Sequence, residues 1–427
     1  MRYADVRPRG VISAGVALLM ASIAACRPGE GRPARPGAAA VIEGLPEGSA
    51  PAVRVGIIVA TDSIVVTGPG DIATSPDSRA YLVDGERWVV RAASGGVVAT
   101  APGKRAMRAS NLLLVRPGQD GLVRIDSMTY RGLIAVRPAA ADRITAVNLI
   151  DVEEYLLGVV PHEIGRRPPA EIEAVKAQAI AARTYAIGNL GAREAEGFDF
   201  YATVLDQVYR GARDEDSVAS RAVRETRGEI VTHDGEPILA YYSSTCGGQT
   251  AAIEESWPWR APLPYLKSVS DAIPGTDSAY CDFSNRYHWT TEWTRDQLLA
   301  VLGQSLRTTL TRQLSTVQGV RVRSRGESGR TTLELRVDST DVLLRADSVR
   351  WVLRTSPGGP ILNSSRIDSL IVDAPDGIVE HLTIHGGGWG HGIGMCQVGA
   401  LGRARRGQRY DEILLAYYTN TEIRKLY

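Results

Sequence analysis

The sequence lacks an excess of charge of either sign. Its 49 Lys and Arg residues are balanced by 48 Asp and Glu residues, which leaves a formal net charge of +1. The basic residues are interspersed with acidic ones along the chain, whereas a nucleic-acid-binding protein presents a basic face. We therefore expect a neutral or mixed-charge partner, and no nucleic acid.

Cysteine is also scarce, with four residues in the whole chain. No Cys-x-x-Cys pair and no paired-histidine spacing occurs, so the common structural zinc motifs are not supported. In an oxidising exterior we favour one disulfide between Cys246 and Cys281, with Cys396 free and buried, and expect no metal. The alternative is a metal site in which His288 is the third ligand.

Three catalytic motifs are incomplete. His162 and Glu163 begin the zinc-protease motif H-E-x-x-H, but Arg166 occupies the fifth position, so the second histidine is missing. The glycine-rich stretch "HGGGWGHGIG" (385–394) resembles the oxyanion loop of esterases, yet no G-x-S-x-G nucleophile motif occurs in the chain. No dinucleotide-binding strand, turn and helix accompany that stretch either. Zinc proteases of the H-E-x-x-H type, esterases with a G-x-S-x-G nucleophile and dinucleotide-binding enzymes are therefore excluded.

Long hydrophobic runs are missing as well. A basic segment (1–10) precedes the apolar run "VISAGVALLMASIAA" (11–25), which is too short for a comfortable membrane span. Small residues then precede Cys26, and this order is typical of a bacterial lipoprotein signal peptide over 1–25. Cys26 would become the acylated first residue. The alternatives are an ordinary signal peptide and a short membrane anchor. Each of these interpretations, like the lipoprotein signal, predicts that the protein is exported.

Residues 26–50 are rich in Pro, Gly and Ala and have no hydrophobic period, which predicts a flexible tether. We therefore expect a lipid anchor at Cys26 that holds the folded part of the chain at a membrane of the cell envelope, on its periplasmic or extracytoplasmic face.

The remaining chain has ample apolar content for a core, since 44% of all residues are hydrophobic. Residues 51–140 show short alternating runs separated by Gly, Asp and Pro, which predict strands and turns. We expect a second domain over 141–427 with a β-rich subdomain around 290–375. The predicted class is α+β, mainly antiparallel sheet with a few helices.

The most regular helical pattern lies just after Glu163. Apolar residues recur at steps of three and four between Ile172 and Ala186, and most of them are alanine. Pro168 and Pro169 suit the start of this long alanine-rich helix. Its other faces carry polar side chains that are either solvated or available to a ligand, namely Lys176, Gln178 and Arg183. Shorter helices are expected at 294–306 and at the start of 410–427.

Several uncharged polar and aromatic side chains suit a sugar-binding cleft, because they can hydrogen-bond hydroxyl groups and stack on ring faces. They lie in "DQVYRG" (206–211), in "YYSSTCGGQT" (241–250) and in or just after the glycine-rich stretch. Each of them is equally well explained as a packed turn or strand residue, so only their convergence would indicate a site. The candidates are Gln207, Tyr209, Ser243, Ser244, Thr245, Trp389, His391 and Gln397.

Six segments in this order carry a family resemblance: "NLIDVEEYLLGVVPHEI", "AVKAQAIAARTYAI", "DQVYRG", "AYYSSTCGGQT", "PYLKSV" and "GGGWGHGIGMCQVGALGRARRGQRYDEILLAYY". Together they resemble the stage II sporulation protein D and amidase-enhancer (SpoIID/LytB) family over about residues 140–427. Such long, ordered motifs are far more specific than a single glycine pattern.

The resemblance implies a lytic transglycosylase that cleaves peptidoglycan between N-acetylmuramic acid and N-acetylglucosamine, preferring strands stripped of stem peptides. It implies that Glu163 is the essential acid, that no cofactor is needed, and that a cell-wall amidase is a possible partner. Some members of the family bind a metal through two cysteines and a histidine. Here Asp206 and Phe200 stand where those cysteines would fall, so the resemblance does not extend to that metal.

Two other functions remain open from the sequence. The chain could bind glycan and stimulate an amidase without cleaving it, as the enhancer branch of the family is thought to do. It could also be a structural envelope lipoprotein with no activity. The intact motif around Glu163 favours catalysis over both.

Overall fold

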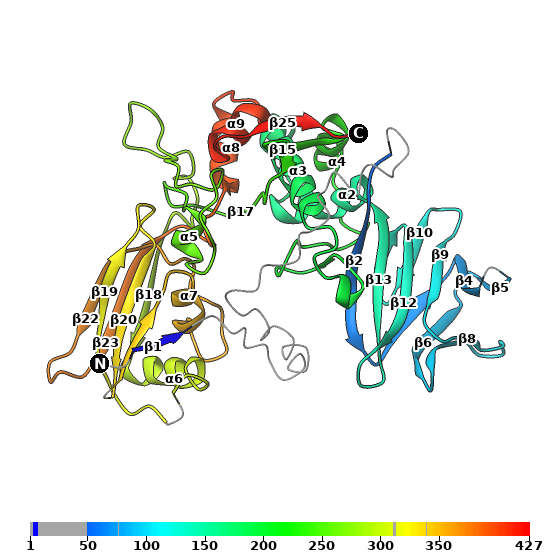
Figure 1. Ribbon diagram of the computed structural model, residues 1–427, viewed down its shortest axis with the longest axis horizontal. Helices are drawn as coiled ribbons and strands as arrows, with labels where there is room; N and C mark the ends of the chain where they lie inside the picture. The colour runs from blue at the N-terminus through cyan, green and yellow to red at the C-terminus, as the bar shows by residue number, and fades with distance from the viewer. Residues whose placement is uncertain (1–2, 7–48, 76, 311–312, 339) are drawn as a thin grey trace. The chain divides into compact units, whose positions relative to one another are not determined.

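The structure is a computed structural model that describes residues 3–6, 49–75, 77–310, 313–338 and 340–427. The chain divides into two compact units. The Glu163 unit comprises residues 49–240 together with Glu422–Tyr427, and the cysteine unit comprises residues 3–6 and Tyr241–Thr421. Both contain helices and largely antiparallel sheet (Figure 1), which confirms the predicted α+β class.

Two sheets form the first part of the Glu163 unit. One has the strand order β14-β2-β13-β12-β9-β4-β5, and the other has the order β11-β10-β3-β6-β7-β8. In β6 (Arg87–Ala93), Trp88 and Val90 are buried while Val89 is exposed, because successive side chains of a strand point to opposite faces. The other strands are β2 (Ala52–Thr61), β3 (Ser63–Thr67), β4 (Gly70–Ser75), β5 (Ser78–Leu82), β7 (Gly96–Thr100), β8 (Met107–Ala109), β9 (Leu113–Pro117), β10 (Leu122–Ile125), β11 (Met128–Arg131), β12 (Leu133–Ala139), β13 (Arg143–Asp151) and β14 (Phe200–Tyr201).

The helix that carries Glu163 starts directly at the end of β13. Helix α2 (Val152–Glu163) is capped by Asp151, whose side chain accepts the backbone N–H of Glu153 at 2.7 Å. Such a cap stabilises a helix by about 1 kcal/mol relative to alanine. Since β13 is an interior strand of its sheet, the sheet fixes the start of the helix that ends at Glu163.

The long alanine-rich helix is α3 (Ile172–Gly188), which follows the short 3-10 helix η2 (Pro169–Glu171). It packs against α2, against α4 (Ser217–Glu225) and against β15 (Glu229–His233). Every residue from 177 to 187 is buried. The pattern predicted one buried face, but elements cover the helix on several sides, as is usual for a helix whose residues are mostly small or apolar all round.

The end of the chain returns to the Glu163 unit. Strand β25 (Glu422–Lys425) pairs antiparallel with β15, and β16 (Glu236–Pro237) lies on the other side of β15. The helix expected at the start of 410–427 is confirmed as α9 (Tyr410–Tyr417), and β25 follows it.

The cysteine unit contains the β-rich stretch expected around 290–375. One sheet has the order β18-β23-β22, another has the order β1-β21-β20-β19, and a large apolar core includes Trp293, Leu333 and Leu382. The helix expected at 294–306 is α6 (Arg295–Ser305). The remaining elements are β18 (His288–Thr294), β19 (Val317–Arg325), β20 (Thr331–Val337), β21 (Thr340–Leu344), β22 (Ile367–Asp373), β23 (His381–Gly387), α5 (Ile253–Ser256) and α7 (Ser348–Val352).

A short parallel pair joins two distant parts of the cysteine unit. Strand β17 (Tyr242–Ser243) pairs with β24 (Met395–Cys396), which leads directly into α8 (Gln397–Arg405). The pairing brings the segment 241–250 beside the end of the glycine-rich stretch, although almost 150 residues of chain separate them.

The predicted boundary between residues 140 and 141 falls between β12 and β13, two paired strands inside the Glu163 unit. The structure places the division at Tyr241 instead. Two long strands hydrogen-bonded along their length belong to one core, so a change from strand-rich to helix-rich sequence does not mark a domain boundary here.

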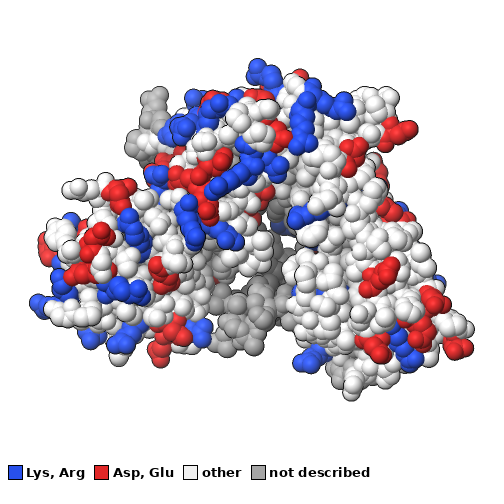
Figure 2. Space-filling model, turned by 180° about the vertical axis from the view of Figure 1, so that it is seen from behind, with Lys and Arg blue, Asp and Glu red and all other residues white. Residues whose placement is uncertain are grey.

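The N-terminal predictions fall largely outside the described residues, including Cys26 and the tether. Strand β1 (Tyr3–Val6) pairs parallel with β21, and cleavage before Cys26 would remove it, so this pairing belongs to the uncleaved chain. Within the described part of the chain, no helix is long and apolar enough to cross a membrane. On the face that Figure 2 shows, basic and acidic side chains are interspersed.

Candidate functional site

Glu163 is the last residue of α2, and its carboxylate is held by the backbone of a distant segment. Its Oε1 accepts the N–H of Val208 at 2.9 Å, and the side chain is half-buried. Val208 lies in the segment 206–211, which the sequence had selected for a different reason, its amide and phenol groups. The structure therefore joins two of the sequence motifs at one carboxylate.

The helix turn that carries Glu163 is apolar. Val159, Val160, Pro161 and Ile164 are all buried. An apolar surrounding favours the neutral form of a carboxyl group, whereas a backbone N–H favours the charged form. Glu163 therefore has buried apolar residues on its own helix turn and a backbone N–H donor at its carboxylate.

Gln207 connects three parts of the Glu163 unit. Its Oε1 accepts the hydroxyl of Tyr155 in α2 at 3.2 Å, and its Nε2 donates to the carbonyl of Ala182 in α3 at 3.3 Å. The side chain is almost fully buried. Gln207 therefore positions the neighbouring Val208 N–H against α2. The sequence also allowed Gln207 to contact a sugar directly, but this burial does not fit such a contact.

Tyr209 anchors the same segment from its other side. Its hydroxyl donates to Asn148 Oδ1 in β13 at 2.8 Å, and burial raises its pKa well above the ordinary value. Gly158 of α2 lies so close that a Cβ there would be 2.4 Å from the carbonyl oxygen of Gly211. Tyr209 is thus a buried positioning residue, and direct contact with a sugar does not fit this burial.

The charged neighbours of Glu163 make other contacts. His162 Nε2 and Arg166 lie 3.8 and 3.9 Å from the carboxylate of Asp214, and Arg166 is largely exposed. Arg167 donates to the carbonyl of Ile164 at 2.7 Å. Burial lowers the pKa of His162, against the opposing charge of Asp214. His162 is therefore neutral near pH 7. Arg166 extends toward solvent, and Arg167 contacts the backbone at the end of α2.

Arg183 is part of a buried ion pair. Its Nε and Nη2 donate to the two carboxylate oxygens of Glu153 at 2.7 and 2.8 Å, and the guanidinium is not exposed at all. Tyr427 donates a further hydrogen bond to Glu153 at 2.6 Å. This buried, paired position does not fit direct contact of Arg183 with a substrate. A paired, buried guanidinium ties α3 to α2 and to the end of the chain.

The other two polar residues of α3 are also engaged in packing. Lys176 forms ion pairs with Glu173 at 3.1 Å and with Glu225 of α4 at 2.9 Å. Gln178 is completely buried, which does not fit direct contact with a substrate. The sequence pattern could not distinguish these roles, because a polar residue on a helix is equally compatible with solvent, a ligand or a buried partner.

A second group of candidates lies in the cysteine unit. Thr245 is fully buried and exchanges two backbone hydrogen bonds with Trp389, at 2.7 and 3.1 Å, so it holds the glycine-rich stretch and does not face a ligand. The carbonyl of Ser244 accepts the N–H of Val398 in α8 at 3.0 Å. Ser244 is half-buried, while Ser243 and Gln397 are buried.

His391 is packed among aromatic rings of the cysteine unit. Its ring centroid lies 5.1 Å from that of Trp257 and 6.2 Å from that of Tyr241, and its Nδ1 accepts the N–H of Ile393 at 3.0 Å. Burial lowers the pKa of His391 to about 4. The imidazole is therefore neutral at physiological pH. Trp389 is partly exposed, with the guanidinium of Arg286 4.1 Å above its ring.

The ten candidate ligand contacts are thus divided between the units. Lys176, Gln178, Arg183, Gln207 and Tyr209 belong to the Glu163 unit, and Ser243, Ser244, Thr245, His391 and Gln397 belong to the cysteine unit.

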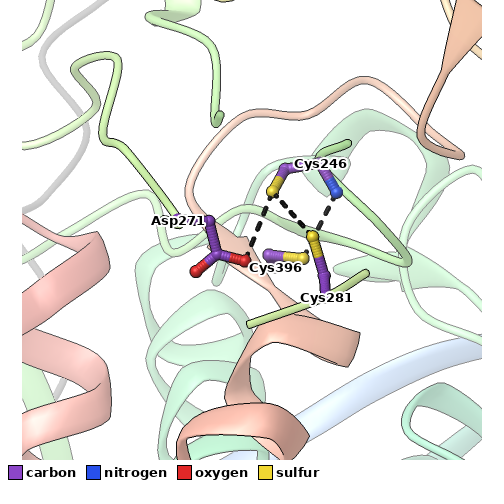
Figure 3. Close-up of side chains that lie close together, drawn as sticks. All are labelled: Cys246, Asp271, Cys281 and Cys396. Atoms are coloured by element: carbon purple, nitrogen blue, oxygen red, sulfur yellow. Dashed lines mark hydrogen bonds between the residues drawn. The ribbon is translucent and has the colours of Figure 1, made fainter. Parts of the chain in front are cut away.

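A cluster that the sequence did not assemble lies in the cysteine unit. Cys246, Cys281, Cys396 and Asp271 are all fully buried, and one ligand atom from each lies within 4.8 Å of all the others (Figure 3). The Sγ atoms of Cys246 and Cys281 are 3.5 Å apart, and all three cysteines are free. The predicted disulfide is therefore not formed in this structure. The prediction that Cys396 is free and buried is confirmed.

Asp271 is the member of this cluster that sequence reasoning missed. Its Oδ2 lies 3.6 Å from the Cys246 sulfur, while its Oδ1 accepts hydrogen bonds from Tyr417 at 2.7 Å and from Arg403 at 3.3 Å. In the sequence it is an ordinary aspartate before a turn. The alternative metal ligand considered from the sequence, His288, is not a member of this group, and its strand partner is Gly387.

Comparison with known proteins finds two matching family models. The model described as "Stage II sporulation protein" matches residues 140–233, which include Glu163, and a domain of unknown function (DUF8618) matches residues 267–394.

Relatives match over larger parts of the chain. An uncharacterized protein of Brachyspira hyodysenteriae is 30% identical over 364 residues, which cover 84% of this chain and 90% of that protein. The amidase enhancer of Bacillus subtilis is 29% identical over 303 residues, covering 63% of this chain and 40% of the enhancer. The stage II sporulation protein D of Bacillus subtilis is 29% identical over 297 residues, which cover 65% of this chain and 76% of that protein.

Proposed function

This chain belongs to the SpoIID/LytB family, and from that premise we propose that it is an exported lytic transglycosylase of peptidoglycan. Its substrate would be glycan strands stripped of stem peptides, and Glu163 would be its acid and base. Cys26 would carry the lipid that anchors it to the cell envelope.

The observation that best supports this proposal is the hydrogen bond from the Val208 N–H to Glu163 Oε1 at 2.9 Å. It orients the carboxylate by backbone atoms, which cannot change rotamer. The buried contacts of Gln207 and Tyr209 hold that backbone in place. A carboxyl group that is oriented in this way, at the end of a packed helix, is prepared for proton transfer without rearrangement.

The proposed reaction uses the same carboxyl group twice. Protonated Glu163 first donates its proton to the glycosidic oxygen, and the bond from that oxygen to C1 of the muramic sugar breaks. The carboxylate then accepts the proton of the C6 hydroxyl of that same sugar, whose oxygen bonds to C1. The products are a new free hydroxyl on the leaving strand and a 1,6-anhydro sugar, and no water is consumed.

One carboxyl group is sufficient because the nucleophile is part of the substrate. A hydrolase normally uses two carboxyl groups, one for the leaving oxygen and one for the sugar or the water. Here the C6 hydroxyl is already held beside C1, so positioning replaces activation. The first step requires Glu163 in its protonated form.

The test is the release of anhydromuramyl products from denuded glycan strands, measured by mass spectrometry. Glu163→Gln keeps the shape of the side chain but cannot transfer the proton, so products should disappear. Glu154→Gln is the matched control, because Glu154 is an exposed glutamate of the same helix, and it should retain activity. Product release by Glu163→Gln at the wild-type rate would refute the assignment.

A second candidate function is stimulation of a cell-wall amidase, because one relative is named an amidase enhancer. In that case the purified chain would bind glycan strands and release no anhydro products. Amide cleavage by an added amidase would increase in its presence, and the Glu163→Gln variant would stimulate as well as the wild type.

A further inference from the structure

We propose that Cys246, Cys281, Cys396 and Asp271 form a closed, structural zinc site inside the cysteine unit. This inference does not rest on the proposed glycan chemistry, because the cluster is a property of the cysteine unit alone. The metal that some family members bind uses other positions, where this chain has Asp206 and Phe200.

The spacing of the four side chains fits one tetrahedral ion. With zinc–sulfur bonds of about 2.3 Å and zinc–oxygen bonds of about 2.0 Å, tetrahedral angles place two sulfurs about 3.8 Å apart and a sulfur and an oxygen about 3.5 Å apart. The Cys246 and Cys281 sulfurs are 3.5 Å apart, and the Cys246 sulfur is 3.6 Å from Asp271 Oδ2. All four ligand atoms lie within 4.8 Å of one another, which leaves room for a single ion.

The surroundings supply the hydrogen bonds that metal-bound groups need. The Cys396 sulfur accepts the backbone N–H of Cys246 and the backbone N–H of Gly399, both at 3.2 Å. Because Cys396 is the N-cap of α8, its sulfur also faces the positive end of a helix dipole. These contacts stabilise a thiolate, which is the form of cysteine that binds zinc.

Asp271 is oriented by groups outside the cluster. Tyr417 and Arg403 donate to its Oδ1, so that Oδ2 is directed at the sulfurs, as Figure 3 shows. Outer hydrogen bonds of this kind set the orientation of metal ligands. Arg403 also offsets part of the negative charge that three thiolates and a carboxylate would bring to a site with one divalent ion.

A disulfide explains less of this arrangement. A bond between Cys246 and Cys281 would use two of the three sulfurs and remove the thiol proton that Cys246 donates to Asp271 Oδ2. That buried oxygen would then face two sulfurs that cannot donate a hydrogen bond, and an unsatisfied buried acceptor is costly. Zinc would bind all four groups, and the thiols would lose their protons on binding.

The site would join three separate parts of the cysteine unit. Cys246 follows β17, Asp271 and Cys281 lie in the long connection before β18, and Cys396 ends β24. The connection between α5 and β18 contains little regular structure, so a metal ion would replace part of the core that such a segment cannot form.

The experiment is metal analysis of the full chain purified after expression in zinc-supplemented medium without chelators. We expect about one zinc per chain for the wild type, and a thiolate-to-cobalt charge-transfer band with tetrahedral d–d bands after exchange into Co²⁺. Cys246→Ser and Cys396→Ser should lose the metal. Cys26→Ser is the matched control, because it removes the fourth cysteine of the chain and should retain the zinc.

A conservative pair of variants tests the site where cysteine variants fail to fold. Tyr417→Phe removes the hydrogen bond to Asp271 and should weaken zinc binding about 10–100-fold in a competition with a chelator. Tyr418→Phe removes the hydroxyl of an equally buried neighbour that donates to the carbonyl of Tyr241, and should leave zinc affinity unchanged. Equal zinc affinities for the two variants would contradict the geometry proposed here.

The chemical state of the cysteines distinguishes a zinc site from a disulfide. Alkylation of the denatured, unreduced chain followed by peptide mass mapping should label Cys246, Cys281 and Cys396 as free thiols. A wild-type chain that contains no zinc, or one in which Cys246 and Cys281 are found linked, would overturn the proposal. Activity toward glycan is not used as a readout, so failure here and failure of the transglycosylase proposal are distinguishable.

Discussion

Replacing Glu153 by Gln is expected to destabilise the Glu163 unit by about 3–5 kcal/mol, because the change leaves a buried charge without its partner. Glu153 holds the guanidinium of Arg183 through two hydrogen bonds of 2.7 and 2.8 Å, and Arg183 is not exposed at all. A glutamine side chain has one acceptor oxygen instead of two and carries no charge, so the guanidinium would keep its desolvation cost and lose the attraction that offsets it.

The expected destabilisation can be divided among the separate contacts of Glu153. Tyr427→Phe removes one hydrogen bond of 2.6 Å to the carboxylate, and a hydrogen bond to a charged group contributes roughly 1.5–3 kcal/mol. The double variant Glu153→Leu with Arg183→Met should recover part of the loss, because an apolar pair of similar volume carries no buried charge.

The same ion pair predicts that the stability of the Glu163 unit depends on pH. Burial alone would raise the pKa of Glu153, but Arg183, Tyr427 and a backbone N–H hold it below its ordinary value. The stabilisation is therefore fully present above the ordinary glutamate pKa of about 4.3 and is lost as the pH falls through the lower value of the folded state. The Glu153→Gln variant should lack this loss of stability in acid.

Hydrogen exchange of the amides in α3 and β15, measured on the full chain, is the appropriate assay, since a chain of two units need not unfold in one step. Glu154→Gln, an exposed change one residue away, is the control. A loss below about 1 kcal/mol, the range of surface ion pairs, would show that the pair does not stabilise the Glu163 unit as described.

Two other predictions concern a glycine and a histidine. Gly158→Ala would place a Cβ 2.4 Å from the carbonyl oxygen of Gly211 and move the segment that orients Glu163. Release of anhydro products should fall about 10–100-fold, with a stability loss of about 1–3 kcal/mol, and an unchanged rate would refute the positioning role. Burial lowers the pKa of His391 to about 4, so the wild type should lose roughly 3 kcal/mol of stability as the pH falls from about 6.5 to 4. Melting temperatures over this range should fall less steeply for His391→Asn, and parallel curves would contradict the burial argument.

Most of the secondary structure could be predicted from the sequence, because the signals that specify it are local. The alternating apolar residues of β6 and the three- and four-residue spacing in α3 are visible in a single window of sequence. Helix α6 begins at a capping box formed by Thr294 and Gln297, two residues close in the chain.

The roles of the polar side chains could not be predicted in the same way. Arg183 and Lys176 lie on the same helix, and both were candidates for ligand binding. The partner of Arg183 is 30 residues away at Glu153, and Tyr427 approaches that carboxylate from 274 residues away. No local pattern records such distances, so the sequence could not show that one of these cations is completely buried.

The cysteines show the same limit. Their number and the exported context suggested a pair, and Cys246 with Cys281 was the natural choice. The structure adds Cys396 and Asp271 to the same buried group, and Asp271 carries no motif that would have identified it.

By itself, the sequence determined the α+β class and the main helices and strands, since these depend on local periodicity. Glu163 became the candidate acid through the family resemblance that the ordered motifs carry. The tertiary structure decided that Val208 orients this acid, that Gln207 and Tyr209 are buried supports, and that three thiols and a carboxylate meet. Burial and charge depend on which distant segments come into contact, and only the folded chain defines those contacts.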